Sequence, residues 1–104
     1  NEILIKKESN LNIIKCYFPE KIEDDIFKKI SSIKYSFVHV DFDLYKPTLD
    51  VIKFVIPRLE KNAIILLDYY NLISQEGVKW AVRDSGVNIR KCIQTQSGQL
   101  ICYT

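Results

Sequence analysis

The sequence predicts an α/β fold with a mostly parallel sheet that ends in an antiparallel hairpin. Short apolar runs rich in β-branched and aromatic residues, typical of buried strands, alternate with amphipathic helical patterns. The last two apolar runs flank Gln96-Ser97-Gly98, a connection typical of a hairpin with glycine at positive φ. With 104 residues, the chain 1–104 is expected to form a single domain.

The expected elements follow from apolar spacing and from the positions of proline and glycine. Apolar residues from Ile22 to Ile33 recur at helical spacing and predict a helix behind Pro19. A second helix is expected from Pro47, after a turn over 44–47, and a third over 76–84 that stops near Gly86. A loop is expected over 69–75, and the expected strands are 11–18, 35–40, 63–67, 89–95 and 99–103.

Charge and cysteine content narrow the class of protein. The formal charge is +2 and the lysines are scattered, which argues against nucleic acid or an acidic membrane as a partner. There is no apolar run of membrane-spanning length, and no signal peptide precedes the first strand, so a cytoplasmic location is expected. Cys16, Cys92 and Cys102 show no metal-binding spacing. Cys16 and Cys102 lie in apolar runs and are expected to be buried thiols, which fits a reducing compartment.

Three carboxylates follow two of the predicted strands. Asp41 and Asp43 come after one apolar run, and Asp68 comes after the run 64–67. Ligands of open α/β sheets bind beyond the carboxyl ends of the strands, so the three aspartates are expected to gather at one rim. Such a set can hold Mg²⁺ and accept a proton. The alternative is that these aspartates only cap the helices that follow.

Other polar and aromatic residues near this rim are ambiguous in sequence. His39 lies in an apolar strand and is expected to be a core histidine, and Trp80 is expected to lie in the core. The side chains of Tyr45, Tyr69 and Tyr70 could line a pocket or simply pack.

Four linked motifs resemble the macrocin O-methyltransferase (TylF-type) family. They are Asp41-Phe-Asp43-Leu-Tyr45-Lys-Pro-Thr48, Pro57-Arg-Leu, Ile64-Ile-Leu-Leu-Asp68-Tyr-Tyr70 and Gly77-Val-Lys-Trp-Ala81-Val. The segment Ile14-Lys-Cys-Tyr-Phe18-Pro19 also looks like the family's preceding segment, so the resemblance covers about residues 11–104.

The resemblance implies a class I, S-adenosylmethionine-dependent methyltransferase. It implies a Rossmann-like sheet with helices on both faces and methylation of sugar hydroxyls of small molecules with the help of Mg²⁺. Asp41 and Asp68 would be metal ligands, and Asp43 would be the general base.

The chain departs from the family at two places. Tyr69 stands where the family has a second aspartate, and the three glycines Gly77, Gly86 and Gly98 form no G-x-G cofactor loop. The chain is therefore expected to match the C-terminal part of the domain, to lack the first two strands and the main cofactor site, and to be inactive alone. We also expect the isolated chain either to self-associate through the edge of the strand 35–40 or to move the strand 11–18 beside it.

Three other functions are alternatives to the methyltransferase. A nucleotide-sugar glycosyltransferase also uses Asp-x-Asp after an apolar run, but this leaves the motifs around Asp68 and Gly77 unexplained. A haloacid-dehalogenase-type phosphatase fails because Tyr45 stands where it needs threonine or valine. The third alternative is a non-catalytic structural or interaction module that retains the second half of the fold.

Overall fold

A computed structural model describes residues 5–7, 11–68, 70 and 76–104. The chain divides into two compact units, Asn1–Ile33 and Lys34–Thr104. The expectation of a single domain over 1–104 stays a prediction. In the described part of the chain, no helix is both long and apolar enough to cross a membrane.

The described residues of the first unit form a small antiparallel sheet and one helix. Strands β1 (Ile5–Lys7) and β2 (Asn12–Ile14) pair with each other, and α1 spans Asp24–Ser31. Helix α1 lies within the predicted segment. Its terminal charges interact favourably with the helix dipole, because Asp24 and Asp25 lie in the first turn and basic side chains lie in the last.

The predicted strand 11–18 is much shorter in the structure. Only Asn12–Ile14 forms β2, and it pairs antiparallel with β1 in a separate two-stranded sheet. This segment therefore does not pair with the strand 35–40, so the alternative in which it fills that place in the sheet is not seen. The apolar run predicted a buried strand, but three of its side chains are exposed: Leu11, Ile13 and Tyr17.

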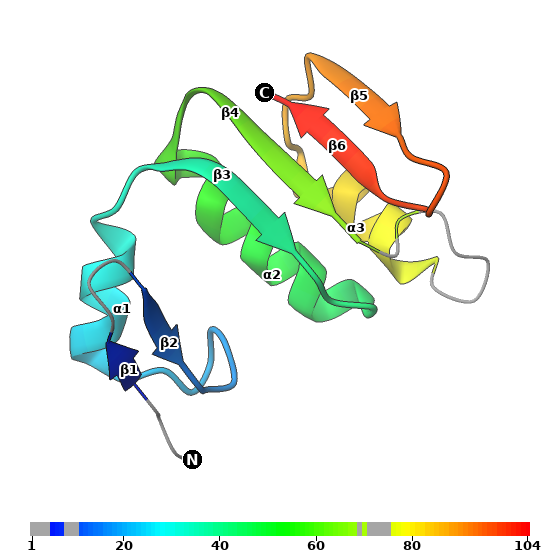
Figure 1. The fold of residues 1–104 in the computed structure, drawn as a ribbon. Helices are drawn as coiled ribbons and strands as arrows, with labels where there is room; N and C mark the ends of the chain where they lie inside the picture. Colours follow the sequence, from blue (N-terminus) through cyan, green and yellow to red (C-terminus); the bar gives the residue numbers. More distant parts are fainter. Residues whose placement is uncertain (1–4, 8–10, 69, 71–75) are drawn as a thin grey trace. The chain divides into compact units, whose positions relative to one another are not determined.

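The second unit is built on a four-stranded mixed sheet with the order β3-β4-β6-β5 (Figure 1). The strands are β3 (Tyr35–Val40), β4 (Leu59–Leu67), β5 (Lys91–Gln94) and β6 (Leu100–Tyr103). Strands β3 and β4 are parallel, whereas β6 pairs antiparallel with both β4 and β5. The α/β class and the antiparallel hairpin are confirmed. The mostly parallel sheet is not, because β6 enters between β4 and β5.

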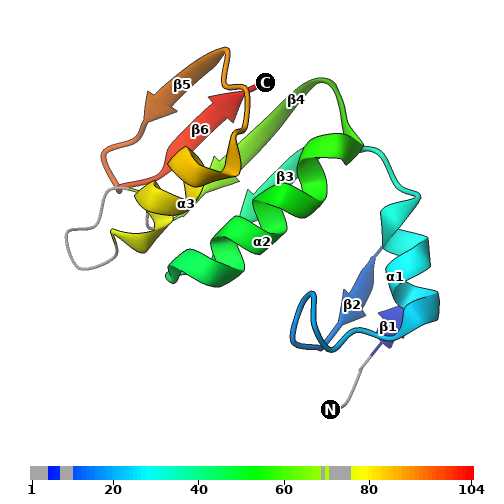
Figure 2. The same cartoon turned by 180° about the vertical axis from the view of Figure 1, so that it is seen from behind.

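Two helices cover one face of this sheet. Helix α2 (Tyr45–Val55), which continues into the 3₁₀ turn Ile56–Arg58, and helix α3 (Gly77–Ser85) lie on the same side (Figures 1 and 2). Burial alternates along the strands accordingly, because successive side chains point to opposite faces. The buried cluster is Val40, Ile52, Ile65, Leu67, Val78, Val82, Leu100 and Cys102. The prediction of helices on both faces of the sheet is not confirmed, because α2 and α3 lie on the same face.

The start of α2 differs from the prediction. Residues 45–47 were expected in a turn, but the helix begins at Tyr45 and takes Pro47 into its first turn, where a missing N–H costs no helical hydrogen bond. The fully buried Thr48 donates its hydroxyl to the Leu44 carbonyl at 2.7 Å and so closes this turn.

The three glycines of the second unit have clear structural reasons. Gly86 ends α3 with φ of 74°, and Gly98 in the β5–β6 hairpin has φ of 91°, as the hairpin prediction required. At Gly77 the reason is space, since a Cβ there would lie 2.9 Å from the backbone nitrogen of Tyr45. The start of α3 therefore packs directly on the start of α2.

Candidate functional site at the ends of β3 and β4

The ends of β3 and β4 bring two of the predicted aspartates to one edge of the sheet. Val40 pairs with Leu67 in the parallel ladder. The backbone N–H of Asp68 then donates to the Val40 carbonyl at 3.0 Å, so the ladder continues one residue beyond both strands. Asp41 and Asp68 thus leave the sheet from neighbouring positions, as expected for parallel strands.

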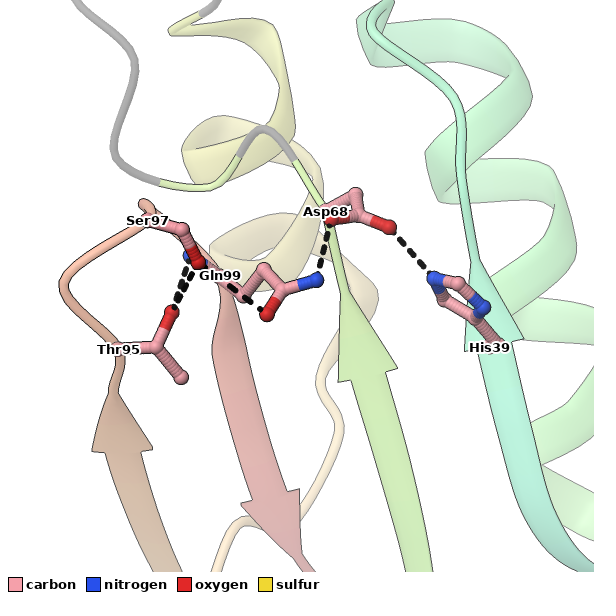
Figure 3. A network of polar contacts seen from close by, with 5 residues as sticks. All are labelled: His39, Asp68, Thr95, Ser97 and Gln99. Carbon is pink, nitrogen blue, oxygen red and sulfur yellow. Dashed lines mark hydrogen bonds and ion pairs between the residues drawn. The ribbon is translucent and has the colours of Figure 1, made fainter.

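The carboxylate of Asp68 is held from both sides (Figure 3). Its Oδ2 lies 2.5 Å from Nε2 of His39 on β3, and its Oδ1 accepts a hydrogen bond of 2.7 Å from the Gln99 amide. An ionised carboxylate only accepts hydrogen bonds, so Nε2 of His39 carries the hydrogen and Nδ1 is left for another partner. The side chain is 23% exposed and therefore stays within reach of solvent.

These two contacts also set the charge of Asp68. The hydrogen bond from His39 is the larger cause that lowers the pKa of Asp68, and the hydrogen bond from Gln99 lowers it further. Partial burial acts in the opposite direction and is outweighed. Asp68 is therefore a carboxylate at neutral pH, fixed in orientation by residues from the strands on either side of it.

The prediction that His39 is a core histidine is wrong. Its side chain is 43% exposed, because Val38 and Val40 take the face covered by α2 and His39 takes the opposite face. The signal was available in the sequence: His39 alternates with two valines and lies two residues before Asp41.

Gln99 was not identified from the sequence as a site residue. It reaches Asp68 because Leu100 pairs with Leu67 across the β4–β6 ladder, which puts the preceding residue opposite Asp68. The hairpin fixes the position of Gln99. The N–H of Gln99 donates to Oγ1 of Thr95 at 3.1 Å, and the hydroxyl of Ser97 bonds to the side chains of both Thr95 and Gln99 (Figure 3). Sequence alone predicted the hairpin but not that β6 would lie beside β4.

Asp41 and Asp43 are exposed and lie between β3 and α2. The capping interpretation is not seen at α2, whose N-cap position is Leu44 and has no side-chain cap hydrogen bond. Within the residues that the structure describes, no three His, Cys, Asp or Glu side chains form a group suited to a metal ion. Tyr69, the departure from the family motif, lies outside the described residues.

The donors at this edge nevertheless have the right chemistry for Mg²⁺. This ion takes carboxylate oxygens and commonly uses only one or two carboxylates, with water and substrate oxygens completing the octahedron. Among the described residues, each oxygen of Asp68 accepts one hydrogen bond, and a carboxylate oxygen has a second lone pair that can bind a cation. Asp41 and Asp68 are therefore the carboxylates at this edge whose chemistry suits a cation.

The neighbouring aromatic residues have structural contacts. The hydroxyl of Tyr45 donates to Oδ2 of Asp84 on α3 at 2.8 Å, and Tyr70 packs against the buried cluster. Trp80 is not in the core as predicted: it is 48% exposed and its ring lies 4.3 Å from the Arg83 guanidinium carbon.

Comparison of the chain with protein-family models gives no match, and comparison with curated proteins gives no significant match.

Proposed function

We propose that this chain is the C-terminal part of an S-adenosylmethionine-dependent O-methyltransferase that acts on sugar hydroxyls with the help of Mg²⁺, in the cytoplasm. The motifs from Asp41 to Val82 support the family. The observation that carries the proposal is the parallel pair β3–β4, which ends in Asp41 and Asp68 at one edge of the sheet.

Each aspartate has a distinct role in this proposal. Asp41 and Asp68 would hold the cation, which when bound lowers the pKa of an acceptor hydroxyl. His39 and Gln99 would keep the Asp68 carboxylate in a fixed orientation, as outer partners of metal ligands do. Asp43 would accept the proton that the attacking hydroxyl loses.

Transfer of the methyl group needs a cofactor site that this sequence does not supply. S-adenosylmethionine, when bound, provides an electrophilic methyl group. The chain holds no G-x-G for it, so we propose that the chain is inactive alone and works with upstream sequence. The acceptor oxygen would attack while Asp43 holds its proton, and positioning would provide much of the rate.

Binding of Mn²⁺, followed by NMR on the isolated chain, tests the cation site. We expect the amide signals of Asp41 and Asp68 to broaden first, because paramagnetic broadening falls steeply with distance. Asp41→Asn and Asp68→Asn should each weaken binding at least tenfold. Glu60→Gln, at an exposed position on β4, is the matched control and should have no effect. Broadening centred elsewhere, or unchanged in both variants, would exclude the metal role.

Calorimetry separates the methyltransferase from the glycosyltransferase alternative. The chain is extended by the coding sequence upstream of Asn1 and titrated with S-adenosylmethionine, and separately with a nucleotide diphosphate sugar plus Mn²⁺. Heat with the first ligand alone supports the proposal. Heat with the second alone identifies a glycosyltransferase, and heat with neither favours a non-catalytic module.

A further inference from the structure

Two of the three cysteines lie directly opposite each other in the sheet. The register of the β5–β6 ladder pairs Cys92 with Cys102, and both thiols are free. Opposite residues of an antiparallel pair point to the same face, so both sulfurs lie on the face of the sheet that carries α2 and α3. Neither residue had been predicted to have a partner, because their spacing in sequence matches no motif.

The hydrogen bonds around this pair identify it as a non-hydrogen-bonded pair, the kind of antiparallel pair in which the two Cα atoms lie closer together. Thr95 N–H donates to the Gln99 carbonyl, and Thr104 N–H donates to the Ala63 carbonyl. In an antiparallel ladder, every second pair of opposite residues is hydrogen-bonded. Counting by twos from these two bonds, Cys102 belongs to a hydrogen-bonded pair with β4 and to a pair without hydrogen bonds with Cys92.

A pair without hydrogen bonds has the distance that a disulfide needs. The Cα atoms of such a pair lie about 4.5 Å apart, within the range of roughly 4.4–6.8 Å found for disulfides. The ladder register and the hydrogen-bond pattern together therefore place the two cysteines at disulfide distance.

We propose that Cys92 and Cys102 are an oxidation site that forms a cross-strand disulfide between β5 and β6. The inference does not depend on the proposed methyltransferase function. The reaction partner is a low-molecular-weight disulfide such as oxidised glutathione, the kind of oxidant that intracellular thiols meet. A disulfide in a reducing compartment would be transient and reversible.

The environments of the two thiols give the order of the steps. Cys92 is exposed, so its thiolate attacks one sulfur of oxidised glutathione, breaks that S–S bond and releases one glutathione thiolate. Cys102 is buried, and burial raises the pKa of its thiol to about 11. It loses its proton to solvent and attacks the Cys92 sulfur, which releases the second glutathione. Two cysteine thiols are oxidised, and one glutathione disulfide is reduced to two thiols.

The disulfide would act on the hairpin that presents Gln99. The connection between β5 and β6 carries the residues that position the Gln99 amide against Asp68. A covalent link between the two strands restrains the hairpin and restricts the unfolded chain, so oxidation should raise the thermal stability of the second unit.

Oxidation of the full chain by glutathione tests the proposal. In the Cys16→Ser variant, which leaves only this pair, we expect both thiols to disappear in a chain that runs as a single chain on non-reducing denaturing gels, with the loss of two hydrogen atoms and a non-reduced peptide that links Cys92 to Cys102. The melting temperature should rise by several degrees and return after reduction.

The control variant is Cys92→Ser in the same background, because its exposed position keeps the fold intact. It should leave Cys102 unmodified and the melting temperature unchanged by glutathione. A stable mixed disulfide at Cys92 with Cys102 still reduced, a disulfide between two chains, or complete resistance of both thiols would overturn the proposal.

Discussion

The Nε2 atom of His39 and the Oδ2 atom of Asp68 lie 2.5 Å apart, joining β3 to the residue that follows β4. Because Gln99 binds the other oxygen, Asp68 is fixed between two strands at the end of the sheet. This geometry makes the central aspartate of the candidate site a rigid group, whereas Asp41 and Asp43 are exposed on a connection.

The first prediction concerns this hydrogen bond. Asp68→Asn should destabilise the second unit by about 1 kcal/mol, which is less than the roughly 1.5–3 kcal/mol of a bond to a charged group, because both partners are partly exposed. In the wild type, ¹⁵N NMR should find the hydrogen of neutral His39 on Nε2, and this preference should be lost in the variant.

A double-mutant cycle supplies the control for this bond. His39→Gln and Asp68→Asn, measured by urea unfolding separately and together, should be non-additive, since they remove the same contact. Additive effects would mean that the two side chains are not coupled.

The second prediction concerns the contact between α2 and α3. The hydrogen bond from Arg83 is the larger cause that lowers the pKa of Asp84, and the bond from Tyr45 lowers it further. A carboxylate with a lowered folded-state pKa stabilises the fold above its ordinary pKa, and this contribution is lost as the pH falls through the folded value.

Asp84→Asn should therefore destabilise the protein near neutral pH and make less difference at about pH 2, well below the ordinary aspartate pKa, because protonation of the wild-type carboxylate removes its contribution there. Urea unfolding at both pH values measures this. Glu60→Gln, at an exposed position on β4 in the same unit, is the control. An equal effect of Asp84→Asn at both pH values would show that the ionised form makes no contribution.

The third prediction concerns the close approach at Gly77. Gly77→Ala should cost about 1–3 kcal/mol, because its Cβ would meet the backbone of Tyr45 and force the two helices apart. Gly86→Ala serves as the comparison: nothing lies near its Cβ, so its cost of about 1 kcal/mol comes from the positive φ. Gly86→Asn should recover part of the stability, while Gly77→Asn should not.

Sequence patterns predicted local elements well but not how the strands assemble. Apolar spacing and terminal charges located α1 and β3, and the glycine signal located the β5–β6 hairpin. No local pattern states that β6 enters antiparallel beside β4, because that pairing joins residues far apart in the chain. The mixed sheet and the contact between Gln99 and Asp68 both follow from this pairing.

The site was partly predictable for the same reason. Aspartate after an apolar strand is a local signal, and parallel pairing of β3 with β4 was enough to bring Asp41 and Asp68 to one edge. His39 was misjudged because an apolar run does not say which alternate positions are covered by helices. In β3 the helices cover only one face, and His39 lies on the other.

The fourth prediction separates the roles of the two aspartates after β3. In the proposed methyltransferase, with the upstream sequence restored, Asp43→Asn should reduce turnover at least a hundredfold, the usual scale for loss of a general base, with little effect on cofactor affinity. Asp41→Asn should instead raise the concentration of Mg²⁺ needed for half-maximal rate. Equal losses of turnover and cofactor affinity in Asp43→Asn would remove Asp43 from the base role.

The fifth prediction concerns the open edge of β3. Among the described strands β3 pairs only with β4, and on the face opposite α2 it carries Phe37, which is 55% exposed. We therefore expect the isolated chain to self-associate along this edge, since an unpaired apolar strand edge is a template for pairing. Light scattering across a concentration series should detect dimers.

Phe37→Lys should weaken this association at least tenfold, because a lysine on an edge strand opposes pairing with a second copy. Ile93→Lys is the matched control: Ile93 lies on β5, at the other edge of the same sheet, and is 42% exposed. If β3 is the interface, Ile93→Lys leaves the dimer unchanged. A monomer at all concentrations, or a loss of association in Ile93→Lys alone, would exclude the β3 edge.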